Sequence, residues 1–326
     1  MPCPNRSHGA PVFHLHIGKT AGRTVYSIAP DIVGLQNCQW NQANLSWGRP
    51  EHFVRTVREH RVELAARPCF TTYEVGWRAV DEGFGPLVPP LVLTTLRDPL
   101  SWVVSAIEHD KLEKRRNKGI DDVVRRGCLF DTSIGENRPA GCLGYDYMNF
   151  VVSRLISEKG VGRFQDTPKT GYGLVHHRPN NWRQEHYAGA HKNAAANIGR
   201  IAIAKAHLDT AIFGLVEHFR ATKCLWKFQF GHKITPEECD CRLAPQTNRR
   251  RSQSPKPDSE REKIDSVHVG VRKTTRETLE LGSLDELRRV SESSFGLLYS
   301  YALMLFLERA RVVEIATSIK LVCGLD

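Results

Sequence analysis

The sequence lacks a hydrophobic run long enough to cross a bilayer. Its longest apolar stretch, residues 295–307, is interrupted by Ser300 and is shorter than the roughly 20 residues of a membrane-spanning helix. The N-terminal segment MPCPNRSHGAP is polar and broken by prolines, so it has no apolar core of the kind found in secretory signals. We therefore expect neither a signal peptide nor a membrane anchor in this chain.

The sequence also lacks internal repeats, a collagen-like glycine period and coiled-coil heptads. Its 326 residues are 40% apolar and 25% charged, which is typical of a globular chain with a sizeable core. Lys and Arg outnumber Asp and Glu by 46 to 36, giving a formal net charge of +10. Such a charge attracts nucleic acid, acidic polysaccharide, phosphorylated cofactors or anionic lipid, and by itself selects none of them.

Cysteine, in contrast, is not scarce. Nine cysteines exceed what a reduced cytosolic enzyme needs, and this number favours an oxidising compartment. The paired Cys-x-x-Cys spacing of zinc sites is absent. Cys224, Cys239 and Cys241, with His232 nearby, are therefore expected to form disulfides or remain free thiols rather than bind zinc.

Segments with the pattern of strands alternate with helical segments along the chain. Apolar runs at 12–17, 69–73 and 91–96 each precede a loop and a helix, and 211–216 lies between two helical stretches. This alternation predicts an α/β fold with a central, largely parallel sheet flanked by helices. In such folds ligands bind at the carboxyl ends of the strands, so these ends are the places to search for a site.

The chain is expected to form one domain. Residues 1–11 read as a polar leader, 12–313 as the domain and 314–326 as a C-terminal tail. Within the domain, 244–265 is rich in charge, Pro and Ser and almost free of apolar residues, which predicts a disordered surface insertion. A long helical pattern covers 284–313.

The turn after the first strand carries the first candidate site. Gly18, Lys19 and Thr20 resemble the end of a nucleotide-binding phosphate loop, but Phe13 stands where that motif needs its first glycine. The remaining strand, short turn and helix can still hold one phosphate-like group through backbone amides and the lysine. His14, on the same strand, is expected to pack in the sheet rather than bind metal.

A second candidate site follows the strand at 91–96. Arg97 ends this strand, and Pro99 fits the first turn of a helix that carries Ser105 two turns later. A guanidinium and a hydroxyl placed in this way can bind a second phosphate. Two anion sites at neighbouring strand ends predict a cofactor with two separated phosphate groups.

These motifs resemble those of carbohydrate sulfotransferases that use 3′-phosphoadenosine 5′-phosphosulfate (PAPS). Residues 13–24 resemble the 5′-phosphosulfate loop of these enzymes, and 96–106 resemble their 3′-phosphate segment. The similarity is greatest to the heparan sulfate 6-O-sulfotransferases, through the segments 149–155, 213–219 and 298–306 in the same order. The resemblance implies a sulfotransferase fold related to phosphate-loop proteins and transfer of a sulfuryl group to a glycosaminoglycan hydroxyl.

The resemblance also implies roles for individual residues. Lys19 is expected to offset charge as the sulfuryl group leaves the phosphate, which makes it both catalytic and cofactor-binding. The remaining cofactor contacts are expected from the loop, from the 3′-phosphate segment and from one later arginine, namely Thr20, Ala21, Gly22, Arg23, Thr24, Arg97, Ser105 and Arg154. No metal is expected. Trp102 stands where the family commonly has an arginine.

The catalytic base is expected after the strand at 69–73. The family's histidine lies shortly before a tryptophan, and Glu74 occupies that place before Trp77. A glutamate can act as the base when burial or a neighbouring anion raises its pKa.

Trp77 and His109 are expected to contact the acceptor. The expected acceptor is a sulfated or acidic polysaccharide and not nucleic acid. The family resemblance implies the Golgi lumen.

Two alternative functions remain open at this point. A nucleotide-dependent kinase on a related fold is one, although it requires a complete phosphate loop and a magnesium-binding acid. A non-catalytic polyanion-binding protein is the other, since a net charge of +10 and the run Arg249 to Arg251 suffice for it.

Overall fold

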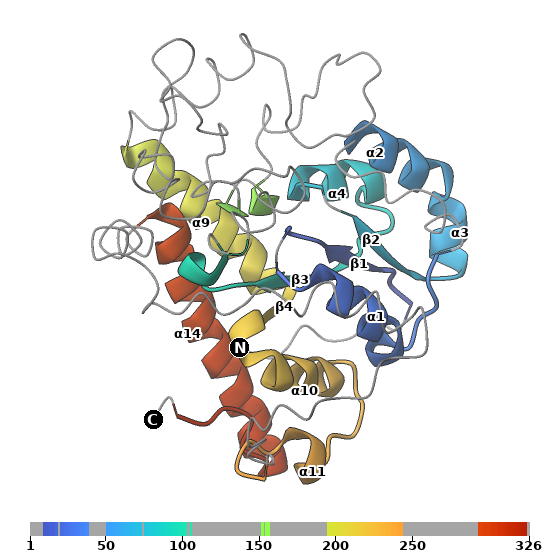
Figure 1. The fold of residues 1–326 in the computed structure, drawn as a ribbon. Coiled ribbons are helices and arrows are strands. Elements are labelled where there is room, and N and C mark those ends of the chain that lie inside the picture. The colour runs from blue at the N-terminus through green and yellow to red at the C-terminus, as the bar shows by residue number, and fades with distance from the viewer. Residues whose placement is uncertain are drawn as a thin grey trace, which may run out of the picture.

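The centre of the fold is a four-stranded sheet in the computed structural model, which describes residues 9–18, 20–38, 50–73, 75–102, 105, 151–152, 154–156, 194–243 and 293–324 (Figure 1). Its strands are β1 (Val12–Leu15), β2 (Phe70–Tyr73), β3 (Leu91–Leu96) and β4 (Ile212–Leu215). They lie in the order β2-β1-β3-β4, and all neighbouring strands are parallel. The expected α/β architecture with a parallel sheet is confirmed.

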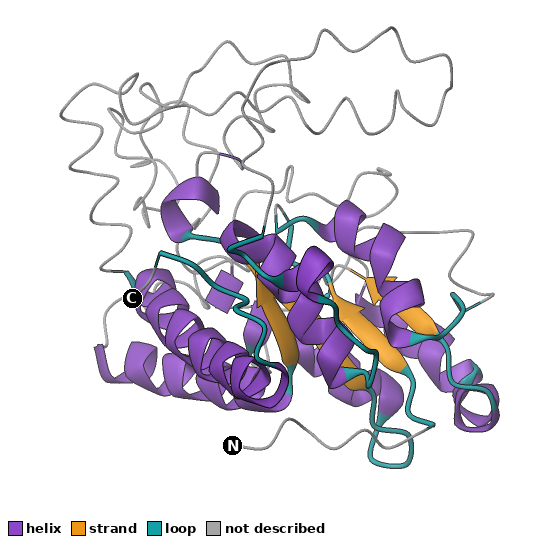
Figure 2. Cartoon of the chain, turned by 90° about the horizontal axis from the view of Figure 1, so that it is seen from below, coloured by secondary structure: helices purple, strands orange, loops and turns teal. Residues whose placement is uncertain are grey.

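Helices lie on either side of the strands, as Figure 2 shows. The helical elements are α1 (Gly22–Val33), α2 (Pro50–Glu59), α3 (Arg61–Ala66), α4 (Trp77–Phe84), α9 (Ala194–Thr210), the 3-10 turn η3 (Val216–His218), α10 (Phe219–Gln229), α11 (Pro236–Cys239) and α14 (Ser294–Thr317). None of the helices in the described ranges has the length and apolarity needed to span a membrane.

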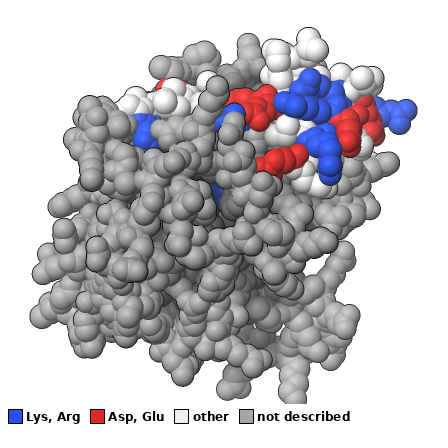
Figure 3. All heavy atoms as spheres, turned by 90° about the horizontal axis from the view of Figure 1, so that it is seen from above, with Lys and Arg blue, Asp and Glu red and all other residues white. Residues whose placement is uncertain are grey.

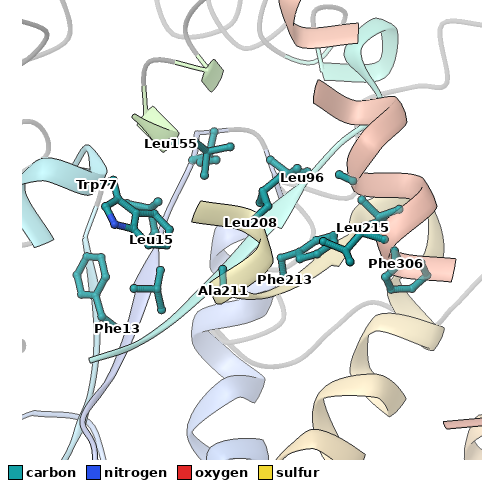
Figure 4. Close-up of a cluster of buried hydrophobic side chains, with 14 of the residues drawn as sticks. Phe13, Leu15, Trp77, Leu96, Leu155, Leu208, Ala211, Phe213, Leu215 and Phe306 are labelled. Carbon is teal, nitrogen blue, oxygen red and sulfur yellow. The ribbon is translucent and has the colours of Figure 1, made fainter. Parts of the chain in front are cut away.

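Both faces of the sheet are buried, which explains why its strands read as apolar runs. Successive strand residues point to opposite faces. Val12 and Leu93 pack in a cluster with residues of α1 and α10. Phe13 and Leu15 point the other way into the larger cluster drawn in Figure 4, to which α4, α9 and α14 contribute side chains such as Leu208.

The C-terminal residues belong to the packed domain. Helix α14 ends at Thr317, beyond the expected end at Val313. Glu314 then holds the chain that follows, because its Oε1 accepts hydrogen bonds from the backbone amides of Leu321 at 2.7 Å and Val322 at 3.1 Å. Ile319, Leu321 and Val322 in the segment after α14 are buried. The expected insertion at 244–265 lies outside the described residues.

Three disulfides are present among the described residues, and they include Cys224, Cys239 and Cys241, for which disulfides or free thiols were expected. The pairs are Cys38–Cys69, Cys224–Cys239 and Cys241–Cys323. His232, which was weighed with these cysteines, instead points its Nε2 at the carbonyl oxygen of Ile32, at 2.6 Å. Disulfides persist in oxidising compartments, in agreement with the cysteine content.

Candidate functional site

The turn between β1 and α1 has the geometry of an anion-binding site. The backbone amide and the hydroxyl of Thr20 both approach the carbonyl oxygen of Ile17, at 3.3 Å and 2.7 Å, and so close a tight turn. Ala21 then adopts a left-handed conformation with φ 62° at the N-cap of α1 and gives the helix no side-chain cap. The first helical amides, from Gly22 to Thr24, are therefore available to an anion.

Gly22, at the start of α1, lies against the ring of His16, which would have to shift to admit a β-carbon. A β-carbon at this position would lie 1.9 Å from Nε2 of His16. His16 in turn stacks on His14, with ring centroids 5.7 Å apart. His14 is buried, as expected, and its Nδ1 lies 2.8 Å from the hydroxyl of Thr72, while burial lowers its pKa well below the usual range.

Strand β3 and the turn after it hold the β1 turn in place. The hydroxyl of Thr95 lies 2.5 Å from the carbonyl oxygen of Thr20. From the helical turn after β3, the indole Nε1 of Trp102 donates a 2.7 Å hydrogen bond to the carbonyl oxygen of Gly18. Both contacts were missed by the sequence reasoning, which treated Trp102 only as a helical residue in place of an arginine.

Arg97 leaves the sheet at the end of β3, next to the β1 turn. Burial lowers the pKa of Arg97, while the carboxylates of Glu217 and Asp98 raise it, and a guanidinium stays protonated in proteins. Asp98 caps the helical turn that begins at Pro99, with its Oδ1 accepting from the amide of Ser101 at 2.9 Å. Ser105, the second expected phosphate contact, is only 6% exposed.

The two expected anion sites flank the point where the strand order reverses. The chain goes from β1 to β2 on one side of the sheet and then to β3 on the other side of β1. In open parallel sheets, ligands bind outside the carboxyl ends of the strands at such a switch point. The β1 turn and Arg97 follow these two adjacent strands, so the topology brings both sites to the edge where a ligand is expected.

Three of the expected catalytic or acceptor-contacting residues, Lys19, Glu74 and His109, lie outside the described residues. The fourth, Trp77, begins α4 and is 7% exposed. Its indole stacks flat on the imidazole of His207, with ring centroids 4.2 Å apart, so it packs within the core. Arg154 is part of a short described stretch and is half-buried.

No family model and no curated protein sequence matches the chain.

Proposed function

We propose that the protein is a PAPS-dependent sulfotransferase that transfers a sulfuryl group to a glycan hydroxyl. The observation that carries this proposal is the pairing of the uncapped first turn of α1 with Arg97 at adjacent strand ends. Two anion-binding elements separated in this way suit a nucleoside that carries one phosphate on the 5′ side and another on the 3′ side. The motif resemblance supplies the identity of that nucleotide.

We assign the two ends of the donor to two elements. The amides of Gly22 to Thr24 bind the 5′-phosphosulfate, assisted by the positive end of the α1 dipole, while the amide of Thr20 closes the turn onto Ile17. Arg97 and Ser105 bind the 3′-phosphate, with the guanidinium supplying paired donors. Lys19 neutralises the charge that develops on the bridging oxygen as the S–O bond to the phosphate breaks. Arg154 is assigned a further contact with the nucleotide.

Glu74 is proposed as the base that accepts the proton of the acceptor hydroxyl, since it directly follows β2 in the sequence and the carboxyl ends of the parallel strands meet at one edge of the sheet. The change Glu74→Gln keeps the shape and removes the basicity, so turnover should fall about a hundredfold or more while 3′,5′-ADP binding is unchanged. Steady-state sulfate transfer and calorimetry measure the two effects. Wild-type turnover in this variant would assign the base elsewhere, with His109 as the next choice.

The acceptor is proposed to be heparan sulfate or a related glycosaminoglycan, modified at a 6-hydroxyl. His109 is proposed to contact the sugar, whereas Trp77 is buried against His207 and is not assigned to the acceptor. The compartment is proposed to be the Golgi lumen. The three disulfides support an oxidising compartment, and the net charge of +10 suits an acidic polysaccharide.

Calorimetric titration separates this proposal from a kinase. A sulfotransferase should bind 3′,5′-ADP more tightly than ATP and should not need magnesium. Equal or tighter binding of ATP, increased by magnesium, would favour the kinase instead. Sulfate transfer to a panel of selectively desulfated glycosaminoglycans then identifies the acceptor and separates the enzyme from a polyanion-binding protein.

A further inference from the structure

Residues from two later segments of the chain lie beside Arg97. Strands β3 and β4 are parallel neighbours, and Leu96 pairs with Leu215 at the end of the ladder. Arg97 and Glu217 therefore leave the sheet at the same edge, from adjacent strands. Their charges interact, as do those of Arg97 and Asp98. Both carboxylates lie near enough to raise the pKa of Arg97.

Helix α14 contributes a hydroxyl that holds one of these carboxylates. The phenol of Tyr299 donates a 3.0 Å hydrogen bond to Oε2 of Glu217. Burial and the adjacent Glu217 raise the pKa of Tyr299, so the phenol keeps its proton and acts as the donor. Glu217 itself is exposed, so the hydroxyl restricts a side chain that would otherwise sample several rotamers.

We propose that Glu217, held by the Tyr299 hydroxyl, is a positioning residue that orients the Arg97 guanidinium towards the 3′-phosphate of the nucleotide. This inference rests on the proposed function. It assigns roles to one residue each of the segments 213–219 and 298–306, to which the resemblance gave no role in the site.

The chemistry of the guanidinium explains why a carboxylate belongs beside it. Arg97 carries five N–H donors in a planar fork, and a phosphate uses two of them. Glu217 can accept from the others and so hold the plane in one orientation before the nucleotide arrives. Such preorganisation lowers the entropy lost on binding. The opposing effect is electrostatic, because the Glu217 charge repels a phosphate, and the two effects predict opposite results when the carboxylate is removed.

The experiment compares two nucleotides that differ only in the 3′-phosphate. Calorimetry gives the dissociation constants of 5′-AMP and 3′,5′-ADP. The constant for 5′-AMP divided by that for 3′,5′-ADP measures how much the 3′-phosphate contributes to binding. The change Tyr299→Phe should lower the ratio roughly three- to tenfold, the worth of one hydrogen bond. Tyr301→Phe is the matched control, because it removes a phenol of the same helix that donates to Asp209 and should leave the ratio unchanged.

A second variant separates positioning from charge repulsion. Positioning predicts that Glu217→Ala lowers the same ratio although it removes a negative charge, whereas repulsion predicts a higher ratio. A higher ratio for Glu217→Ala, or equal ratios for Tyr299→Phe and Tyr301→Phe, would overturn the inference alone. Equal binding of both nucleotides by the wild-type protein would overturn the proposed donor as well, and thermal unfolding of each variant checks that the fold is intact.

Discussion

Gly22, the residue that begins α1, packs against the side chain of His16 in the preceding turn. Gly22 lies against the imidazole of His16, at a distance that leaves no room for a β-carbon. The helix could tolerate alanine by its intrinsic preference, since alanine is the better helix former. Packing overrides this preference here, and it does so beside the amides that are proposed to hold the 5′-phosphosulfate.

The change Gly22→Ala should therefore lower the free energy of unfolding by about 1–3 kcal/mol, the usual cost of overpacking. Gly199→Ala in α9 is the control, because a β-carbon there meets no atom within 4 Å and should instead add about 0.5–1 kcal/mol. Urea unfolding of both variants measures the difference. Equal stability of Gly22→Ala and wild type would show that His16 moves aside without cost.

The location of this site follows from the sequence, but its details do not. A strand, a turn of small residues and a helix predict that Thr20 to Thr24 can hold an anion, and the uncapped start of α1 agrees with that expectation. Neither periodicity nor a motif reports the direction of a side chain in a turn. The contact of His16 with Gly22 therefore had no signal in the sequence.

At the scale of elements, β3 and the helical turn after it support the β1 turn. Thr95 and Trp102 reach carbonyl oxygens on either side of Lys19, those of Thr20 and Gly18. A tryptophan here cannot make the phosphate contact that an arginine could make. Its indole N–H instead stabilises the backbone of the β1 turn.

The change Trp102→Phe should remove this hydrogen bond and leave the carbonyl oxygen of Gly18 without its donor. Compared with Trp226→Phe, it should cost about 1–3 kcal/mol more in the free energy of unfolding. The comparison is matched because both rings are buried, while the indole nitrogen of Trp226 has no hydrogen-bond partner among the described residues. Calorimetry should also show weaker 3′,5′-ADP binding for Trp102→Phe only. Equal losses of unfolding free energy in the two variants would show that the Trp102 hydrogen bond does not stabilise the β1 turn.

The elements themselves were largely predictable. A sheet buried on both faces requires apolar strands, so the apolar runs at 91–96 and 211–216 indicated strands. Strands β3 and β4 lie within these runs. The boundaries were less predictable. The apolar run at 12–17 continues past the end of β1, because Ile17 is buried as part of the turn rather than paired in the sheet. Apolarity reports burial and not strand pairing.

At the scale of the whole molecule, disulfides tie distant parts of the chain together. Cys241–Cys323 closes a separation of 82 residues, and Cys224–Cys239 closes one of 15. The sequence indicated that Cys224, Cys239 and Cys241 form disulfides or remain free thiols, but spacing alone cannot give the partners. Cys241 meets Cys323 because α14 returns the chain to this end of the molecule, where the residue before Cys323 packs in the core.

Loss of the long-range disulfide should cost more than loss of the local one. In the chain-entropy account, Cys241→Ser/Cys323→Ser lowers the free energy of unfolding by roughly 4–5 kcal/mol and Cys224→Ser/Cys239→Ser by about 3 kcal/mol. Chemical denaturation of the two double variants gives both values. A smaller loss for the 82-residue pair would show that unfolded-state entropy does not control their contributions.

The formal net charge of +10 attracts anions in general and does not specify which anion binds or where. In the described part of the face shown in Figure 3, cationic and anionic side chains are interspersed, and they form no patch of one sign there. Long-range attraction of this kind raises encounter rates and is screened by salt. This long-range attraction does not by itself accelerate a reaction, because catalysis depends on charge placed at the reacting atoms.

Sulfate transfer by the Lys19→Ala variant measures whether the protein transfers sulfate from PAPS and whether Lys19 supports that reaction. Labelled sulfate is followed from PAPS to 6-O-desulfated heparan sulfate, with Arg249→Ala as a control that removes the same charge from the expected insertion. We predict that the wild type transfers sulfate. Turnover should fall a hundredfold or more in Lys19→Ala and stay normal in Arg249→Ala, because only Lys19 is assigned to the charge that develops in the transition state. Near-normal turnover of Lys19→Ala, or no transfer by the wild type to any glycosaminoglycan, would contradict this prediction.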